Sequence, residues 1–107
     1  MKNNECPKIK SDDLEFKGID GGGIPIYHHN GKPFSGVVLE YYGEVLDGEI
    51  EYVNGYQEGA ERNYYKNGSL ESELMLKDNK LHGVCSEWDE EGNLITQTVW
   101  ENGVKIQ

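Results

Sequence analysis

Basic residues are scarce in this chain of 107 residues. Lysine and arginine together number 10, against 20 aspartates and glutamates, which gives a net charge of −10. A nucleic-acid-binding protein needs a basic surface, and an anionic membrane repels an acidic protein. We therefore expect neither nucleic acid nor a membrane as a partner. The macromolecule that this charge would attract is a basic protein.

Long hydrophobic runs are also missing. No apolar stretch approaches the ~18 residues that cross a membrane. Charged residues occur throughout the first 20 positions, where a signal peptide would need an apolar region. The two cysteines, Cys6 and Cys85, are too few for a disulfide framework. These absences predict a cytoplasmic protein whose thiols stay reduced.

What the chain does have is an internal repeat of about 24 residues. Asn-Gly pairs, or Asp-Asn in one case, begin at residues 30, 54, 78 and 102. Glycines recur at positions 36, 59 and 83, and an aromatic residue follows each of them five residues later. Leucines recur at positions 46, 70 and 94. Several residue types in phase over three copies indicate a repeat protein.

Each copy predicts a β-hairpin. Asn-Gly between two alternating segments favours a type I′ turn, which needs positive φ at both central residues. We expect such turns at Asn54-Gly55 and at the further pair Asn67-Gly68. No segment has a helical period. The fold class expected is all-β, with residues 24–107 forming an antiparallel meander of 24-residue hairpin repeats, and with residues 1–23 either loosely ordered or a degenerate repeat.

These turns predict a register and two sheet faces. Val53 would lie opposite Tyr56, Ile50 opposite Gly59, Tyr65 opposite Leu70 and Glu51 opposite Glu58. Because side chains alternate along a strand, the apolar positions collect on one side. Face one, the expected core, carries Val38, Tyr42, Leu46, Ile50, Tyr52, Tyr65, Leu70, Leu74, Leu76, Leu81, Leu94 and Trp100. Face two carries Val37, Leu39, Tyr41, Asp47, Glu49, Glu51, Tyr64, Glu71, Glu73, Val84 and Trp88.

The pattern of Gly-x5-aromatic, Asn-Gly-x-Leu and Gly resembles the MORN repeat variant of bacterial antitoxin and immunity proteins. Residues 59–79 and 83–103 fit it well, whereas the copy at 36–54 is two residues short at its turn, Tyr42-Gly43-Glu44. The resemblance implies a single elongated, curved antiparallel sheet with a role in binding proteins. Small bacterial members neutralise a cognate toxin, and other MORN arrays are scaffolds.

The sequence offers no catalytic or metal-binding motif. His82 and Cys85 are three residues apart, so in a strand they point to opposite faces and cannot share a ligand. Gly21-Gly22-Gly23 lacks the Lys-Ser/Thr that follows in a phosphate-binding loop. We expect a protein that is not an enzyme, with no catalytic residues, no metal and no cofactor.

The functional prediction rests on the aspartates and glutamates. Residues 31–107 contain 15 acids and 6 bases, so the charge belongs to the sheet. Aromatic residues beside charge are typical of binding hot spots. The expected partner-binding residues are Tyr41, Asp47, Glu49, Glu51, Tyr64, Glu71, Glu73 and Trp88.

We interpret the chain as an immunity protein or antitoxin. Its acidic face would imitate a phosphate backbone and occlude the active site of a basic toxin, in the first place a nuclease. Three alternatives remain open. The acids on this face can serve solubility alone. The repeat can be a scaffold with no toxin partner, or a module that self-associates through its sheet edges. The rows of acids can also belong to a hydrolase, which would show turnover when purified.

Overall fold

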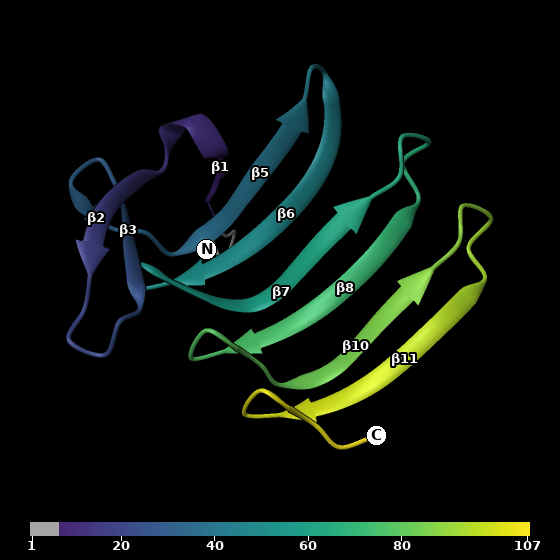
Figure 1. Cartoon of the computed structure of the whole chain (residues 1–107). Helices are drawn as coiled ribbons and strands as arrows, with labels where there is room; N and C mark the ends of the chain where they lie inside the picture. Colours follow the sequence, from purple (N-terminus) through teal and green to yellow (C-terminus); the bar gives the residue numbers. More distant parts are fainter. Residues whose placement is uncertain (1–6) are drawn as a thin grey trace, which may run out of the picture.

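The structure describes residues 7–107, and this computed structural model contains two β-sheets (Figure 1). The larger sheet holds β1 (Lys8–Lys10), β5 (Gly36–Tyr42), β6 (Val45–Val53), β7 (Tyr56–Tyr64), β8 (Leu70–Lys77), β10 (Gly83–Trp88), β11 (Leu94–Glu101) and β12 (Val104–Lys105) in that order, and β9 (Lys80–Leu81) pairs with β8. The smaller sheet holds β2 (Glu15–Ile19), β3 (Pro25–His29) and β4 (Lys32–Pro33). A 3-10 turn, Ser11–Asp13, is the one helical element among the described residues. None of them forms a helix that could span a membrane.

The all-β prediction is confirmed, and β5 to β11 form the expected antiparallel meander. Two features differ from a single antiparallel sheet: β1 pairs with β5 in parallel, and β2–β4 form a sheet of their own. The strands are visibly curved (Figure 1). The molecule measures 41 × 35 × 32 Å, so it is broader than the elongated sheet that the resemblance implied.

Four turns have the predicted type I′ geometry: three follow β6, β8 and β11 of the larger sheet, and the fourth joins β3 and β4 of the smaller sheet. Both central residues have positive φ at 30–31, 54–55, 78–79 and 102–103, with values between 50° and 89°. Asparagine and aspartate tolerate this left-handed conformation better than other side chains, and glycine adopts it without strain. The 24-residue spacing of these pairs therefore places a tight turn at the same end of every copy.

The prediction for Asn67-Gly68 is wrong. The Tyr65 carbonyl accepts a hydrogen bond from the Gly68 N–H at 2.9 Å, and the Tyr65 N–H donates to the Ser69 carbonyl at 2.9 Å. Gly68 has a φ of 92°, whereas Asn67 does not have positive φ. The loop is a type I turn followed by a glycine bulge, the usual longer hairpin connection. As a result Tyr64, and not Tyr65, lies opposite Leu70. Directly opposed residues share a face, so the prediction of face one for Leu70 is wrong. The same holds for Leu46, which lies opposite Tyr41, and for Leu94, which lies opposite Trp88.

The register of β6 and β7 is partly as predicted. Val53 lies opposite Tyr56, but Ile50 lies opposite Glu61 and not opposite Gly59. The cause is an irregularity between Ile50 and Tyr52 that shifts the pairing by two residues. A shift of two keeps each side chain on its predicted face, because the side-chain period of a strand is also two.

The recurrent glycines mark strand positions whose backbone conformation side chains rarely adopt, and two of the three also have no room for a Cβ atom. Gly36, Gly59 and Gly83 all have positive φ, between 107° and 152°. A Cβ atom on Gly59 would collide with the Glu51 carboxylate, and one on Gly36 would collide with the Pro7 carbonyl. The glycine series therefore reflects backbone conformation and close approach, both of which favour glycine.

The core lies where the smaller sheet packs against face one of β5 and β6. Phe34, Val38 and Tyr52 form a buried cluster, and Val38 is only 1% exposed. The apolar side chains packed on it are Ile9, Leu14, Tyr27 and Ile50. Val38, Ile50 and Tyr52 were predicted core residues, whereas Phe34 was not.

Face one is less covered away from this cluster. Leu74 and Leu76 in β8 are half-buried. Two other predicted core residues are wrong: Tyr42 is 74% exposed and Leu94 is 53% exposed. The reason is that the second sheet packs on the N-terminal strands, while Tyr42 and Leu94 lie beside the turns at the opposite end of their strands.

The N-terminal region has the turn order of a repeat copy. In the loop after β2, Gly23 N–H donates to the Asp20 carbonyl at 3.0 Å and Asp20 N–H to the Ile24 carbonyl at 2.9 Å. These bonds match those at Tyr65–Ser69, and a type I′ turn at 30–31 follows. Residues 8–10, which we expected to be loosely ordered, pair with β5. Residues 1–6 lie outside the described part of the chain.

Candidate protein-binding surface

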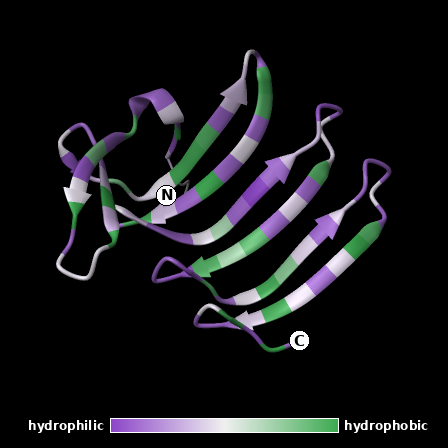
Figure 2. Ribbon diagram, viewed as in Figure 1, coloured by the Kyte–Doolittle hydropathy of each residue, from purple (hydrophilic) through white to green (hydrophobic). Residues whose placement is uncertain are grey.

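A row of polar side chains crosses face two. Glu49 in β6 lies opposite Leu39 in β5 on one side and opposite Arg62 in β7 on the other. Arg62 in turn lies opposite Glu73 in β8, and Glu73 lies opposite Ser86 in β10. Gln97 completes the row opposite Ser86 and donates to the Ser86 hydroxyl at 3.1 Å. The bands of polar and apolar residues that alternate along these strands are visible in Figure 2. Face two thus carries Glu49 and Glu73, as the sequence predicted, together with apolar side chains such as Leu39.

Arg62 organises the centre of this row. Its Nε lies 2.7 Å from Oε2 of Glu73, and its Nη1 lies 3.6 Å from Oε2 of Glu51. The Arg62 side chain is 32% exposed. Hydrogen bonding to Glu73 is the main cause that raises the pKa of Arg62, so the guanidinium stays charged. Arg62 therefore neutralises part of the acidic face from within.

Tyr64 is tied to the same group of residues. Its hydroxyl donates to Oε1 of Glu49 at 2.6 Å. Burial and this hydrogen bond raise the pKa of Tyr64 to about 12, which keeps the hydroxyl protonated as a donor. We call Glu49, Glu51, Arg62, Tyr64 and Glu73 the central network.

The predicted pairing of Glu51 with Glu58 is wrong. Glu51 lies at the irregularity in β6, and its Oε1 accepts a hydrogen bond from the Ala60 N–H at 3.0 Å. The absence of a side chain on Gly59 leaves room for this carboxylate. The repulsion expected from two opposed glutamates is replaced by a backbone hydrogen bond and an ion pair with Arg62.

A second group of acids gathers at the end of the sheet that carries the 65–69 and 89–93 loops. The Tyr65 hydroxyl donates to the Trp88 carbonyl at 2.7 Å. Burial raises the pKa of Tyr65, and the charges of four surrounding carboxylates add to this effect. We call these four residues the loop-end acids: Glu71, Glu87, Asp89 and Glu90.

The loop-end acids have little basic compensation: Lys66 lies in the 65–69 loop but forms no ion pair among residues 7–107. Residues 81–104 contain no lysine and no arginine. Both ion pairs found in residues 7–107 involve Arg62, which is in the central network. Asp89 also stays ionised, because a hydrogen bond from the Asn93 N–H at 2.9 Å is the largest cause that lowers its pKa. This end of the sheet therefore presents net negative charge.

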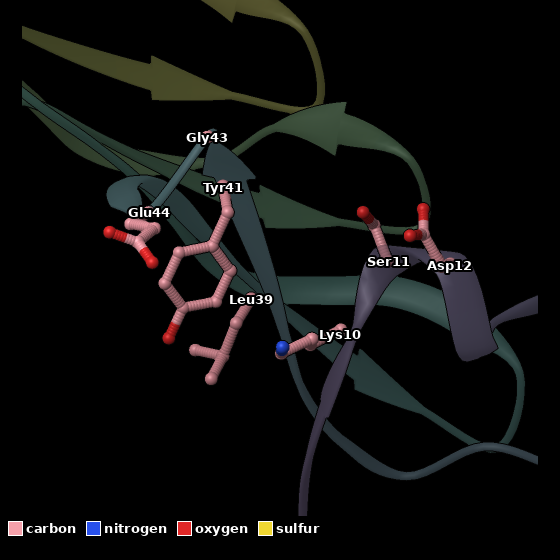
Figure 3. Close-up of a pocket in the computed structure, with 7 residues that line it drawn as sticks. All are labelled: Lys10, Ser11, Asp12, Leu39, Tyr41, Gly43 and Glu44. Carbon is pink, nitrogen blue, oxygen red and sulfur yellow. The ribbon is translucent and has the colours of Figure 1, made fainter.

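Tyr41 lines an open pocket of about 400 Å³ on the same side of the sheet. Figure 3 shows its ring above Leu39, with Lys10 on one side and Glu44 on the other. The Lys10 ammonium lies 5.5 Å from the centre of the ring, a cation–π distance. The ring itself is 44% exposed, so it remains available for contact.

The eight residues predicted for binding therefore fall into two groups. Glu49, Glu51, Tyr64 and Glu73 are half-buried and engaged with one another through the central network. Tyr41, Asp47 and Glu71 are exposed, and Trp88 is half-buried.

Sequence reasoning missed Arg62, although it lies two residues before Tyr64 and alternation alone places it on face two. It also missed most of the loop-end acids, since only the stacking of two loops brings them together. Residues 7–107 contain no group of three or more His, Cys, Asp or Glu that could hold a metal ion.

The central network predicts a measurable effect of removing its cation. Arg62→Met should lower the free energy of unfolding by about 1–3 kcal/mol at neutral pH, because it leaves carboxylates without their charged hydrogen-bond donor. Urea unfolding at pH 7 measures this. In Arg62→Met/Glu73→Gln one of those carboxylates is gone, so part of the stability should return. Equal stability of the single and double variants would contradict the network.

Comparison with known proteins finds one similarity. Residues 57–78 and 81–104 match the MORN repeat variant family. No curated protein and no solved structure matches the chain. Each matched segment covers one long hairpin, β7–β8 or β10–β11, together with residues of the type I′ turn that follows it. The region from 57 to 104 is therefore similar to two MORN repeat variant units.

Proposed function

We propose that this protein is an acidic binding module that neutralises a basic protein toxin, as an immunity protein or antitoxin does. The observation that carries the proposal is the net negative charge of the loop-end acids, together with the exposed residues of face two. A nuclease active site is cationic because it must bind phosphates. Carboxylates held on a rigid sheet can occupy such a site and exclude the nucleic acid.

The division of face two into two groups gives this proposal a mechanism. The side chains of the central network bond to one another, so their positions are fixed before a partner binds. The exposed acid Asp47 and the loop-end acids produce a negative electrostatic field that speeds encounter with a basic partner. Tyr41 supplies an exposed aromatic contact nearby. No catalytic step is part of this proposal.

A second candidate function is a scaffold built from MORN repeats. The match of residues 57–104 to the repeat variant favours an interaction module in general, and it fits this candidate as well as the first. The two differ in what the bound partner does, since a scaffold's partner need not be toxic.

Co-purification followed by a rescue assay tests the proposal. The chain is affinity-purified from its native host, and the protein bound to it is identified and expressed alone. We expect a basic domain whose expression stops growth, with growth restored by co-expression of this chain. A catalytically dead form of the domain should still bind.

A partner that binds but is harmless to growth would support the scaffold instead. Sustained hydrolysis of nucleic acid, phosphoester or peptide by the purified chain alone would contradict a purely binding role.

A further inference from the structure

The edge of the larger sheet at β11 is open over five residues. The C-terminal residues cover only its far part: Trp100 and Glu101 pair with β12, and Val99 bonds to Ile106 and Gln107. Among the described residues no strand pairs with Leu94–Thr98 on that side. We call these five residues the edge segment. Backbone N–H and C=O groups left free on a sheet edge are a template for another strand.

In the preceding repeat copy, the equivalent strand edge is already paired with another strand. The outer edge of β8 receives β10 through Ser72 opposite Glu87 and Glu73 opposite Ser86. Adding 24 residues to Ser72 and Glu73 gives Thr96 and Gln97, at the centre of the edge segment. The repeat thus places an equivalent docking edge on β11, and in this structure it is uncovered.

The composition of the edge segment is unusual for this chain. It carries no charge, although the net charge of the protein is −10. Ile95 is 60% exposed, and Leu94 is exposed as well. The other end of the larger sheet is β1, which has three residues, two of them lysine. Short length and lysine are devices that discourage edge pairing, and the edge segment has neither.

We propose that the edge segment is a self-association site that pairs antiparallel with the same segment of a second copy of this chain. Because Val99 is already bonded to the C-terminal residues, only 94–98 is free, and the two-fold axis of such a pair passes through its midpoint, Thr96. Thr96 then lies opposite its counterpart, and Ile95 opposite Gln97. No like charges oppose one another in this register, which favours a second copy over a charged partner strand.

Cysteine cross-linking tests the register. Directly opposed residues of an antiparallel pair have Cβ atoms about 4.5–5.5 Å apart, close enough for a disulfide after small adjustment. In a Cys6→Ser background, Thr96→Cys should give a covalent dimer under mild oxidation. The matched variant Thr98→Cys, two residues along the same face, should give little. Equal cross-linking of the two variants, or of neither, would overturn the proposed pairing.

Sedimentation of the 107-residue chain over a concentration series tests the association itself. We expect a mass that rises toward twice the monomer mass, and Ile95→Lys should abolish the rise. Val45→Lys, at an exposed position beside the turn after β5, is the matched control and should leave it unchanged. A monomer at every concentration, or a dimer that persists in Ile95→Lys, would overturn the proposal.

The effect of salt concentration distinguishes self-association at the edge segment from binding of a basic partner to the acidic surface. Two copies of an acidic chain repel each other, so added salt should strengthen self-association. Binding of a basic partner to the acidic face should weaken under the same change. Failure of either site therefore leaves the other one testable.

Discussion

Replacing Phe34 by alanine should lower the free energy of unfolding by about 3–5 kcal/mol. Phe34 is 4% exposed, and its ring centre lies 6.1 Å from that of Tyr52 and 5.9 Å from that of His29. It joins the two sheets, so the substitution leaves a cavity between them. Since a domain has about 5–15 kcal/mol of stability in total, this is a large share.

Urea unfolding followed by tryptophan fluorescence measures the effect of Phe34→Ala. The backbone of Phe34 also accepts a hydrogen bond from the Gly55 N–H at 2.8 Å, and alanine retains that bond. The loss therefore reports on the side chain. Tyr42→Ala, at a position that is 74% exposed, is the control and should change stability by less than about 0.5 kcal/mol. Equal effects of the two substitutions would mean that the second sheet does not pack as described.

Removing three exposed acids should slow association with the basic partner by about tenfold at low salt, within the range that electrostatic steering covers. The variant is Glu44→Gln/Asp47→Asn/Glu71→Gln. All three side chains are exposed and lie outside the central network, so shape and stability are retained. Stopped-flow association with the partner found by co-purification measures the rate.

A matched variant tests whether the positions of the removed charges matter, or only their number. Asp13→Asn/Glu15→Gln/Asp78→Asn also removes three charges from exposed positions, none of which lies in a strand of the larger sheet. Its association rate should stay close to that of the parent chain. The difference between the variants should vanish near 1 M salt, where the Debye length is about 3 Å. Equal slowing by both variants would mean that only net charge matters and that face two is not the binding surface.

Much of the fold could be predicted because its signals are local. Asn54-Gly55 and the equivalent pairs form type I′ turns since two adjacent residues must have positive φ, whatever surrounds them. Alternation along each strand then placed Glu49 and Glu73 on face two, and it places Glu61 on face one, opposite Ile50 and Leu74. Asn67-Gly68 shows the limit of this reasoning. The Asn67 amide donates to the Glu90 carbonyl in the next loop at 3.2 Å, a contact between residues 23 positions apart that no local rule contains.

The sequence by itself determined the repeat, the strand class and the acidic character of the protein, because these depend on spacing and composition. Tertiary structure decided which half of face one is a core, since only the packing of a second sheet buries Phe34 beside Val38 and Tyr52. It also decided which carboxylates are free to bind. Glu51 and Glu73 lie 22 residues apart in the chain, and only the register of three strands brings both of them to Arg62.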